Sequence, residues 1–164
     1  VNNAGILPMQ SRVAEMTSER LQHVFSVNIT GCFLCAREAV KYMSTNSGGT
    51  GGSIVNLSSA AARLGSPHEF VDYAASKGAI DAFTIGLAKE VATEGIRVNA
   101  VRPGLIDTEI HASAGEPQRI DRLRSAIPMQ REGSAEEVAQ TILWLLSPSS
   151  SYTTGSFIEV SGGR

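Results

Sequence analysis

Short apolar runs alternate with longer stretches of helical periodicity along this chain, and that alternation constrains the fold more than any other feature. Three apolar runs have the length and flanking turn residues of buried strands: 53–58, 96–101 and 157–160. Val1 is interpreted as the end of an earlier strand, because a loop-like segment follows it. Strands separated by helices of this length are joined by crossovers and lie parallel in one sheet. The sequence therefore predicts an α/β fold with a doubly wound, Rossmann-like parallel sheet, forming a single domain over 1–164.

The stretches between the strands carry helix start and stop signals. Helical spacing of apolar residues predicts helices over about 17–43 and 73–94 and from 134 onward. Thr17 is a suitable N-cap, and Ser134 forms a capping box with the glutamate three residues later. Residues 107–132 are polar and contain Gly and Pro, which predicts an irregular segment. The run GGTGG at 48–52 precedes a strand, so it is interpreted as a turn and not as a phosphate cradle.

Three loops follow strands in this scheme, over residues 3–5, 58–60 and 103–105. The carboxyl ends of parallel strands share one edge of the sheet, and ligands of such folds bind there. We therefore expect these loops to form one rim that carries the chemistry.

Composition excludes several other classes of function. The net charge is −2 and no run of Lys or Arg could follow a nucleic-acid backbone. No apolar stretch reaches the roughly 18–20 residues of a membrane span, and no signal peptide is visible. Cys32 and Cys35 lie within an apolar helical run, so we interpret them as core residues, not as a redox or metal pair. These features predict a cytoplasmic protein without a metal site that binds neither nucleic acid nor membrane.

Tyr73 and Lys77 are the strongest candidates for catalysis. Because they are four residues apart in a predicted helix, their side chains share one face. A phenol with a pKa near 10 is a poor acid-base catalyst at neutral pH, and a neighbouring ammonium group is expected to lower that pKa. Ser59 ends the preceding strand and could hold a substrate oxygen against Tyr73. Asn28 lies inside an earlier helix, where an amide could interrupt the backbone ladder and support a water molecule or the lysine.

Taken together, the motifs resemble those of the short-chain dehydrogenase/reductase family, specifically its C-terminal catalytic portion. The matching runs, in order, are NNAG at 2–5, VN at 27–28, Ser59, YAASK at 73–77, RVN at 97–99 and PG at 103–104. The resemblance implies an NAD- or NADP-dependent oxidoreductase that interconverts an alcohol and a carbonyl compound. It implies that Tyr73 is the acid-base, that Ser59 orients the substrate and that Lys77 binds the nicotinamide ribose. Asn28 would hold a proton-relay water.

The resemblance also implies a set of cofactor contacts: Asn3, Ala4, Gly5, Ser58, Tyr73, Lys77, Pro103, Gly104, Ile106 and Thr108. The family's glycine-rich dinucleotide turn and the first half of its sheet are missing from this sequence. The residues that distinguish NAD from NADP lie in that half, so the sequence does not predict which cofactor is preferred. The segment from Ser59 to Tyr73 is about one residue longer than is usual in the family, and Ser58 is therefore the alternative orienting serine. The extra length lies around 67–70, which is expected to line the substrate pocket. The mobile segment 107–131 resembles the family's substrate lid, and its charged and small residues without a continuous apolar face fit a loop that orders on binding. His111 and Arg119 in this lid are expected to be solvated.

Two other functions compete with this interpretation. One is a non-catalytic dinucleotide-binding relative, which would have no need of Tyr73 and Lys77 together. The other is a sugar-nucleotide epimerase, for which the compact C-terminal portion leaves little room. The substrate is expected to be a small alcohol or carbonyl compound, and the sequence looks similar to both sugar/polyol dehydrogenases and 3-oxoacyl-carrier-protein reductases. Helices with apolar residues on more than one side predict a homotetramer, or at least a dimer.

Overall fold

The computed structural model describes residues 1–164 and contains one three-stranded parallel sheet in the order β1-β2-β3. The strands are β1 (Gly52–Leu57), β2 (Ile96–Pro103) and β3 (Phe157–Val160). Pairing of Gly52 with Ile96 and of Ala100 with Phe157 sets the two registers. Asn2 forms an isolated parallel bridge to Asn56 on the free side of β1, as expected for the end of a further strand. The predicted parallel α/β sheet is confirmed.

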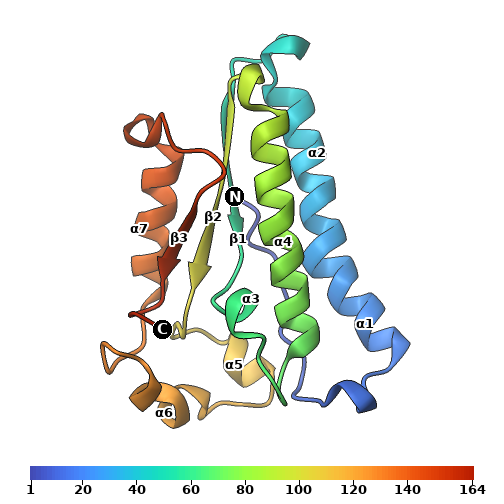
Figure 1. Ribbon diagram of the computed structural model, residues 1–164, viewed down its shortest axis with the longest axis vertical. Helices are drawn as coiled ribbons and strands as arrows, with labels where there is room; N and C mark the ends of the chain where they lie inside the picture. Colours follow the sequence, from blue (N-terminus) through green and yellow to red (C-terminus); the bar gives the residue numbers. More distant parts are fainter.

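Helices cover both faces of this sheet (Figure 1). α2 (Gly31–Met43) and α4 (Val71–Glu90) lie side by side on one face, and α7 (Ala135–Leu146) lies on the other. Alternation along β1 explains the two layers, because Ile54 belongs to a core cluster with Ala88 of α4, whereas Val55 packs in a cluster with Leu145 of α7. Because helices cover both faces of the sheet, the strand sequences are continuous apolar runs and do not alternate between apolar and polar residues.

The first predicted helix is present but is interrupted. α1 (Ser18–Phe25) begins at Thr17, whose side chain accepts a hydrogen bond from the Arg20 amide, as predicted. A π-helical turn, η2 (Ser26–Thr30), then separates it from α2, and Asn28 lies in this turn. Single π turns inside α-helices often mark functional sites. The expectation that Asn28 disturbs the helical ladder is therefore confirmed.

Most predicted boundaries lie within a few residues of those in the structure, with one exception. The helix predicted to end at Glu94 ends at Glu90, and the short turn η4 (Ala92–Glu94) follows it. The third helix begins at Ser134 with the predicted capping box. Residues 48–52 form a turn in which Gly48 and Gly51 have positive φ angles, again as predicted. The remaining short elements are η1 (Val13–Glu15), η3 (Thr45–Ser47), α3 (Ala61–Leu64) and η6 (Pro148–Ser150).

Two expectations about individual segments are wrong. Residues 107–132 are not irregular, because they contain α5 (Ile110–Ser113), α6 (Arg119–Leu123) and the turn η5 (Arg124–Ala126). Cys35 is exposed and Cys32 is only partly buried, so the two thiols are not both core residues. Within the apolar run that contains them, Ala36 is buried, whereas Phe33 and Leu34 are exposed. None of the helices is long and apolar enough to cross a membrane.

Candidate functional site

The predicted rim exists and encloses a large cavity. In Figure 1 the short helices α3, α5 and α6 gather beyond the carboxyl ends of the strands. The cavity there has a volume of about 750 Å³. All three predicted loops contribute to its wall, through Asn3 and Gly5, Ser58 to Ala60, and Pro103 to Leu105. The parallel topology alone brings together loops that are far apart in the sequence.

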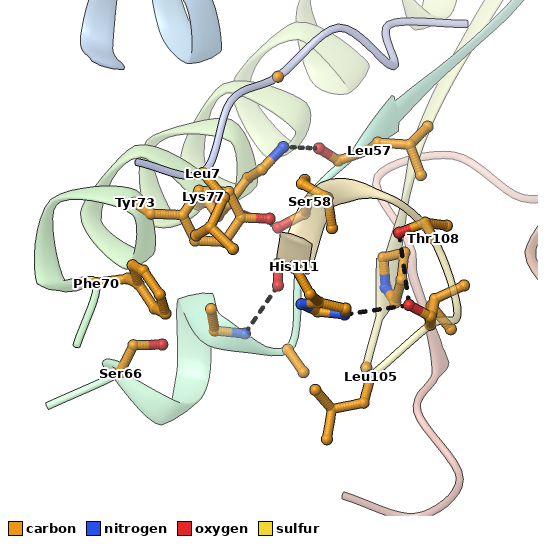
Figure 2. A pocket seen from close by; sticks show the side chains of 18 of the residues that line it. Leu7, Leu57, Ser58, Ser66, Phe70, Tyr73, Lys77, Leu105, Thr108 and His111 are labelled. Carbon is orange, nitrogen blue, oxygen red and sulfur yellow. Dashed lines mark hydrogen bonds between the residues drawn. The ribbon is translucent and has the colours of Figure 1, made fainter. Parts of the chain in front are cut away.

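Tyr73 and Lys77 both line this cavity from the first turns of α4 (Figure 2). The Lys77 ammonium nitrogen is 5.6 Å from the centre of the Tyr73 ring, and it donates a hydrogen bond of 2.7 Å to the backbone carbonyl of Leu57. Burial lowers the pKa of Lys77 to about 8, although the side chains of Cys32 and Asp81 partly oppose the shift. The spacing argument therefore placed the two groups correctly on one face of the helix.

The direction of the Tyr73 pKa differs from the sequence expectation. Burial of the phenol raises its pKa above the ordinary value, and this effect exceeds the opposing effects of the Ser59 side chain and the Arg119 charge. The ammonium of Lys77 does not contribute, because it points to the Leu57 carbonyl. At neutral pH the Tyr73 hydroxyl consequently keeps its proton.

Ser59 and Ser58 have different surroundings. The Ser59 hydroxyl oxygen accepts a hydrogen bond of 3.1 Å from the Ala61 amide, and hydrogen bonding between Ser59 and Tyr73 favours the phenolate. The Ser58 hydroxyl is buried and donates to a carboxylate oxygen of Asp81 at 2.6 Å. Of the two serines, Ser59 is therefore the one whose hydroxyl meets the tyrosine.

Asn28 does not line the cavity, but it supports the wall behind it. Its amide nitrogen donates to the Ile6 carbonyl at 3.0 Å and to the Ser76 hydroxyl at 3.1 Å, and its oxygen accepts from the Ile6 amide at 2.8 Å. These bonds fix the loop after Asn2 against α4. A water relay at Asn28 stays a prediction.

The residues expected to contact a dinucleotide line the same cavity, with the exception of Ala4. A Cβ added at Gly5 would lie 3.5 Å from both the Lys77 nitrogen and the Asn28 oxygen. A Cβ added at Gly104 would lie 2.8 Å from the Ser161 Cα, so this loop requires glycine for close packing. Ile106 and Thr108 continue the wall on the opposite side. The small residues, a buried ammonium group and the position at the strand ends fit the nicotinamide end of a dinucleotide.

Sequence reasoning missed the polar wall that the lid contributes. His111 and Arg119 were expected to be solvated, but each is only 8% exposed and both line the cavity. Arg119 pairs with Glu69 at 2.7 Å and lies over the Phe70 ring at 4.7 Å. No local pattern indicates this, because the pairing depends on the fold bringing together residues fifty positions apart. The longer 67–70 segment was the available hint, and Pro67, Glu69 and Phe70 do line the cavity as expected.

Comparison with known proteins agrees with this geometry. Residues 1–164 match the family model described as enoyl-(acyl carrier protein) reductase. The chain is 65% identical to the uncharacterized oxidoreductase YgfF of Escherichia coli over 164 residues, which are 100% of this chain and 66% of that protein. A solved structure of 3-ketoacyl-(acyl-carrier-protein) reductase from Brucella melitensis complexed with NADH superposes with a TM-score of 0.90 at 30% identity, covering 99% of this chain and 65% of that one. A structure of substituted ElxO with NADPH bound gives a TM-score of 0.86 at 33% identity, covering 99% and 64%.

The parallel sheet, its cavity beyond the strand ends and the helices on both faces place the molecule in the class of Rossmann-like α/β proteins. Within that class, the chain belongs to the short-chain dehydrogenase/reductase family. It spans about two thirds or less of the length of the relatives described above.

Proposed function

We propose that the protein is an NAD- or NADP-dependent oxidoreductase that interconverts an alcohol and a ketone or aldehyde. The observation that carries this proposal is the position of Tyr73. Its phenol lines the cavity at the strand ends, interacts with the Ser59 hydroxyl and lies on the same helix face as Lys77. A proton donor, a hydrogen-bonding hydroxyl and a buried cation at one cavity wall are the groups that carbonyl reduction needs.

The chain's own residues would act on the substrate oxygen. Ser59 would hold that oxygen against Tyr73, and the Tyr73 hydroxyl would give it a proton as the carbonyl becomes an alcohol. In the reverse direction Tyr73 would take the proton from the alcohol. Because burial raises its pKa, Tyr73 is protonated at neutral pH, which suits it to reduction.

A bound nicotinamide would supply or accept the hydride. Lys77 would hold its ribose, with Gly5, Pro103 and Gly104 as close backbone neighbours. Asn3, Ala4, Ser58, Ile106 and Thr108 complete the proposed contacts. The two solved relatives described above carry NADPH and NADH, which supports a dinucleotide of either kind.

The alternative of a non-catalytic dinucleotide-binding relative is less well supported. A binding protein would gain nothing from a buried ammonium group beside a buried phenol, since burying Lys77 costs free energy. For the substrate, a sugar or polyol and a 3-oxoacyl thioester both stay as candidates.

We propose further that the protein assembles as a homotetramer, or at least a dimer. Large apolar side chains are exposed on two separate faces: Phe33, Leu34 and Ile85 on α2 and α4, and Leu143, Trp144 and Leu146 on α7. Two apolar faces on opposite sides of the sheet provide the two interfaces that a tetramer of identical chains uses. Free thiols at Cys32 and Cys35 fit a cytoplasmic, reducing environment.

The proposal is tested by following NADH and NADPH oxidation by the full-length protein with a panel of ketones and aldehydes. We expect Tyr73→Phe to lose roughly 10²-fold or more of kcat, since general acid catalysis supplies that much. Tyr42→Phe and Tyr152→Phe are matched controls, because both tyrosines are exposed and distant from the cavity wall. Equal rates for wild type and Tyr73→Phe would refute the proposal.

A further inference from the structure

His111 is a polar side chain of the cavity wall with an unused hydrogen-bonding atom in a buried position. It lies on α5, is 8% exposed and lines the cavity together with Tyr73. Its Nδ1 atom is buried and has no hydrogen-bond partner in the protein. An acceptor left in this state costs free energy, so native structures seldom contain one without a reason.

The tautomer of His111 follows from its other nitrogen. Nε2 lies 3.1 Å from the backbone carbonyl oxygen of Ile106, which can only accept a hydrogen bond, so Nε2 carries the proton. Burial lowers the pKa of His111 below 6.5, an effect that outweighs its hydrogen bond to Ile106 and is strengthened by the charge of Arg119. The imidazole is therefore neutral at pH 7, and Nδ1 presents a lone pair.

The direction of that lone pair matters for the substrate. In Figure 2 one ring nitrogen of His111 makes the hydrogen bond drawn as a dashed line, and the other lies on the side of the ring toward Tyr73 and Phe70, which line the same cavity. No hydrogen bond joins Nδ1 to Arg119. The Arg119 Nη1 atom is also buried without a hydrogen bond, but it forms an ion pair with the Glu69 carboxylate at 2.7 Å. Nδ1 of His111 therefore has no hydrogen-bond donor in the protein, and a donor group of the substrate could supply one.

We propose that His111 determines substrate specificity by accepting a hydrogen bond from a hydroxyl group of the substrate other than the reacting oxygen. The substrate class is then a hydroxylated ketone or aldehyde, with the corresponding diol or polyol as the alcohol. The acyl chain of a 3-oxoacyl thioester carries no hydrogen-bond donor next to its reacting carbonyl, so it leaves Nδ1 unsatisfied. This inference rests on the proposed oxidoreductase function and deepens it.

The test compares butan-2-one with its 1-hydroxy, 3-hydroxy and 4-hydroxy derivatives as substrates of the full-length protein. We expect at least one hydroxylated compound to exceed butan-2-one in kcat/KM by roughly tenfold or more, because a buried acceptor discriminates strongly against a ligand that leaves it unpaired. His111→Phe keeps a flat ring without the acceptor, and this preference should be lost. His111→Asn places an amide oxygen near the position of Nδ1 and should retain the preference for the hydroxylated substrate.

The kcat/KM for butan-2-one, measured in each of the three proteins, is the internal reference, and the preference is expressed as the ratio of each hydroxylated compound to butan-2-one. Equal kcat/KM for all four compounds in the wild type, or the same preference in all three proteins, would overturn the inference while leaving the oxidoreductase function intact. Absence of any turnover that depends on Tyr73 would contradict the proposed function, and the inference would fall with it.

Discussion

Lys77 gives the sharpest quantitative prediction, because a buried ammonium group makes stability depend on pH. The side chain is 5% exposed, and its pKa falls from 10.5 to about 8 in the folded protein. Below pH 8 Lys77 is protonated in both the folded and the unfolded protein. Burial of its charge then lowers the free energy of unfolding by about 3 kcal/mol, the value that corresponds to this difference in pKa. Between pH 8 and 10.5 the folded state releases the proton first, so the unfolded state binds more protons and the free energy of unfolding rises with pH.

The perturbation is Lys77→Met, which removes the charge and keeps an unbranched apolar side chain. Urea denaturation of the full-length protein should show the wild type gaining about 2 kcal/mol relative to the variant between pH 7 and 9.5, because the other titrating groups cancel in the difference. Lys89→Met is the matched control on the same helix, since Lys89 is exposed, and its difference from wild type should stay constant. Parallel wild-type and Lys77→Met curves would refute the reasoning.

Three further predictions concern groups around the cavity. Asn28→Ala leaves two partly buried backbone groups of Ile6 without their partner and should lower the free energy of unfolding by roughly 1–3 kcal/mol in urea denaturation; an unchanged midpoint would contradict this. Gly104→Ala brings a Cβ to within 2.8 Å of a neighbouring backbone atom and should raise the cofactor Kd about tenfold in a fluorescence titration, the effect of ~1.4 kcal/mol. Gly86→Ala is its control, because nothing lies within 4 Å of the added atom. Glu69→Gln removes the carboxylate that holds Arg119, so trypsin should cut within 107–132 several-fold faster; an equal cleavage rate would show that the ion pair does not hold the lid.

The sheet and the main catalytic candidates could be predicted because both depend on short-range patterns. Alternating apolar runs and helical periodicity are local, and parallel topology then determines where the strand ends meet. Tyr73 and Lys77 follow from a spacing of one helical turn, and Ser59 follows from its place after a strand. The capping box at Ser134 is likewise contained within four residues.

The rest of the cavity depends on contacts that no local pattern encodes. The burial of Arg119 requires Glu69 and Phe70 to meet the lid across fifty positions of sequence. The raised pKa of Tyr73 results from burial, which spacing cannot reveal. Spacing also cannot reveal that the Lys77 ammonium donates its hydrogen bond to the Leu57 carbonyl. The polar composition of 107–132 suggested a disordered lid, whereas ion pairs and short helices order it.

The central claim is that Tyr73 and Ser59 jointly hold the reacting oxygen of the substrate. A crystal structure of the full-length protein with an oxidised nicotinamide cofactor and an unreacted alcohol tests it most directly. We predict that the alcohol oxygen lies within about 3.2 Å of both the Tyr73 and the Ser59 hydroxyl oxygens, the reach required for proton transfer and orientation. An alcohol oxygen held elsewhere in the cavity, with the Tyr73 hydroxyl unengaged, would contradict the account.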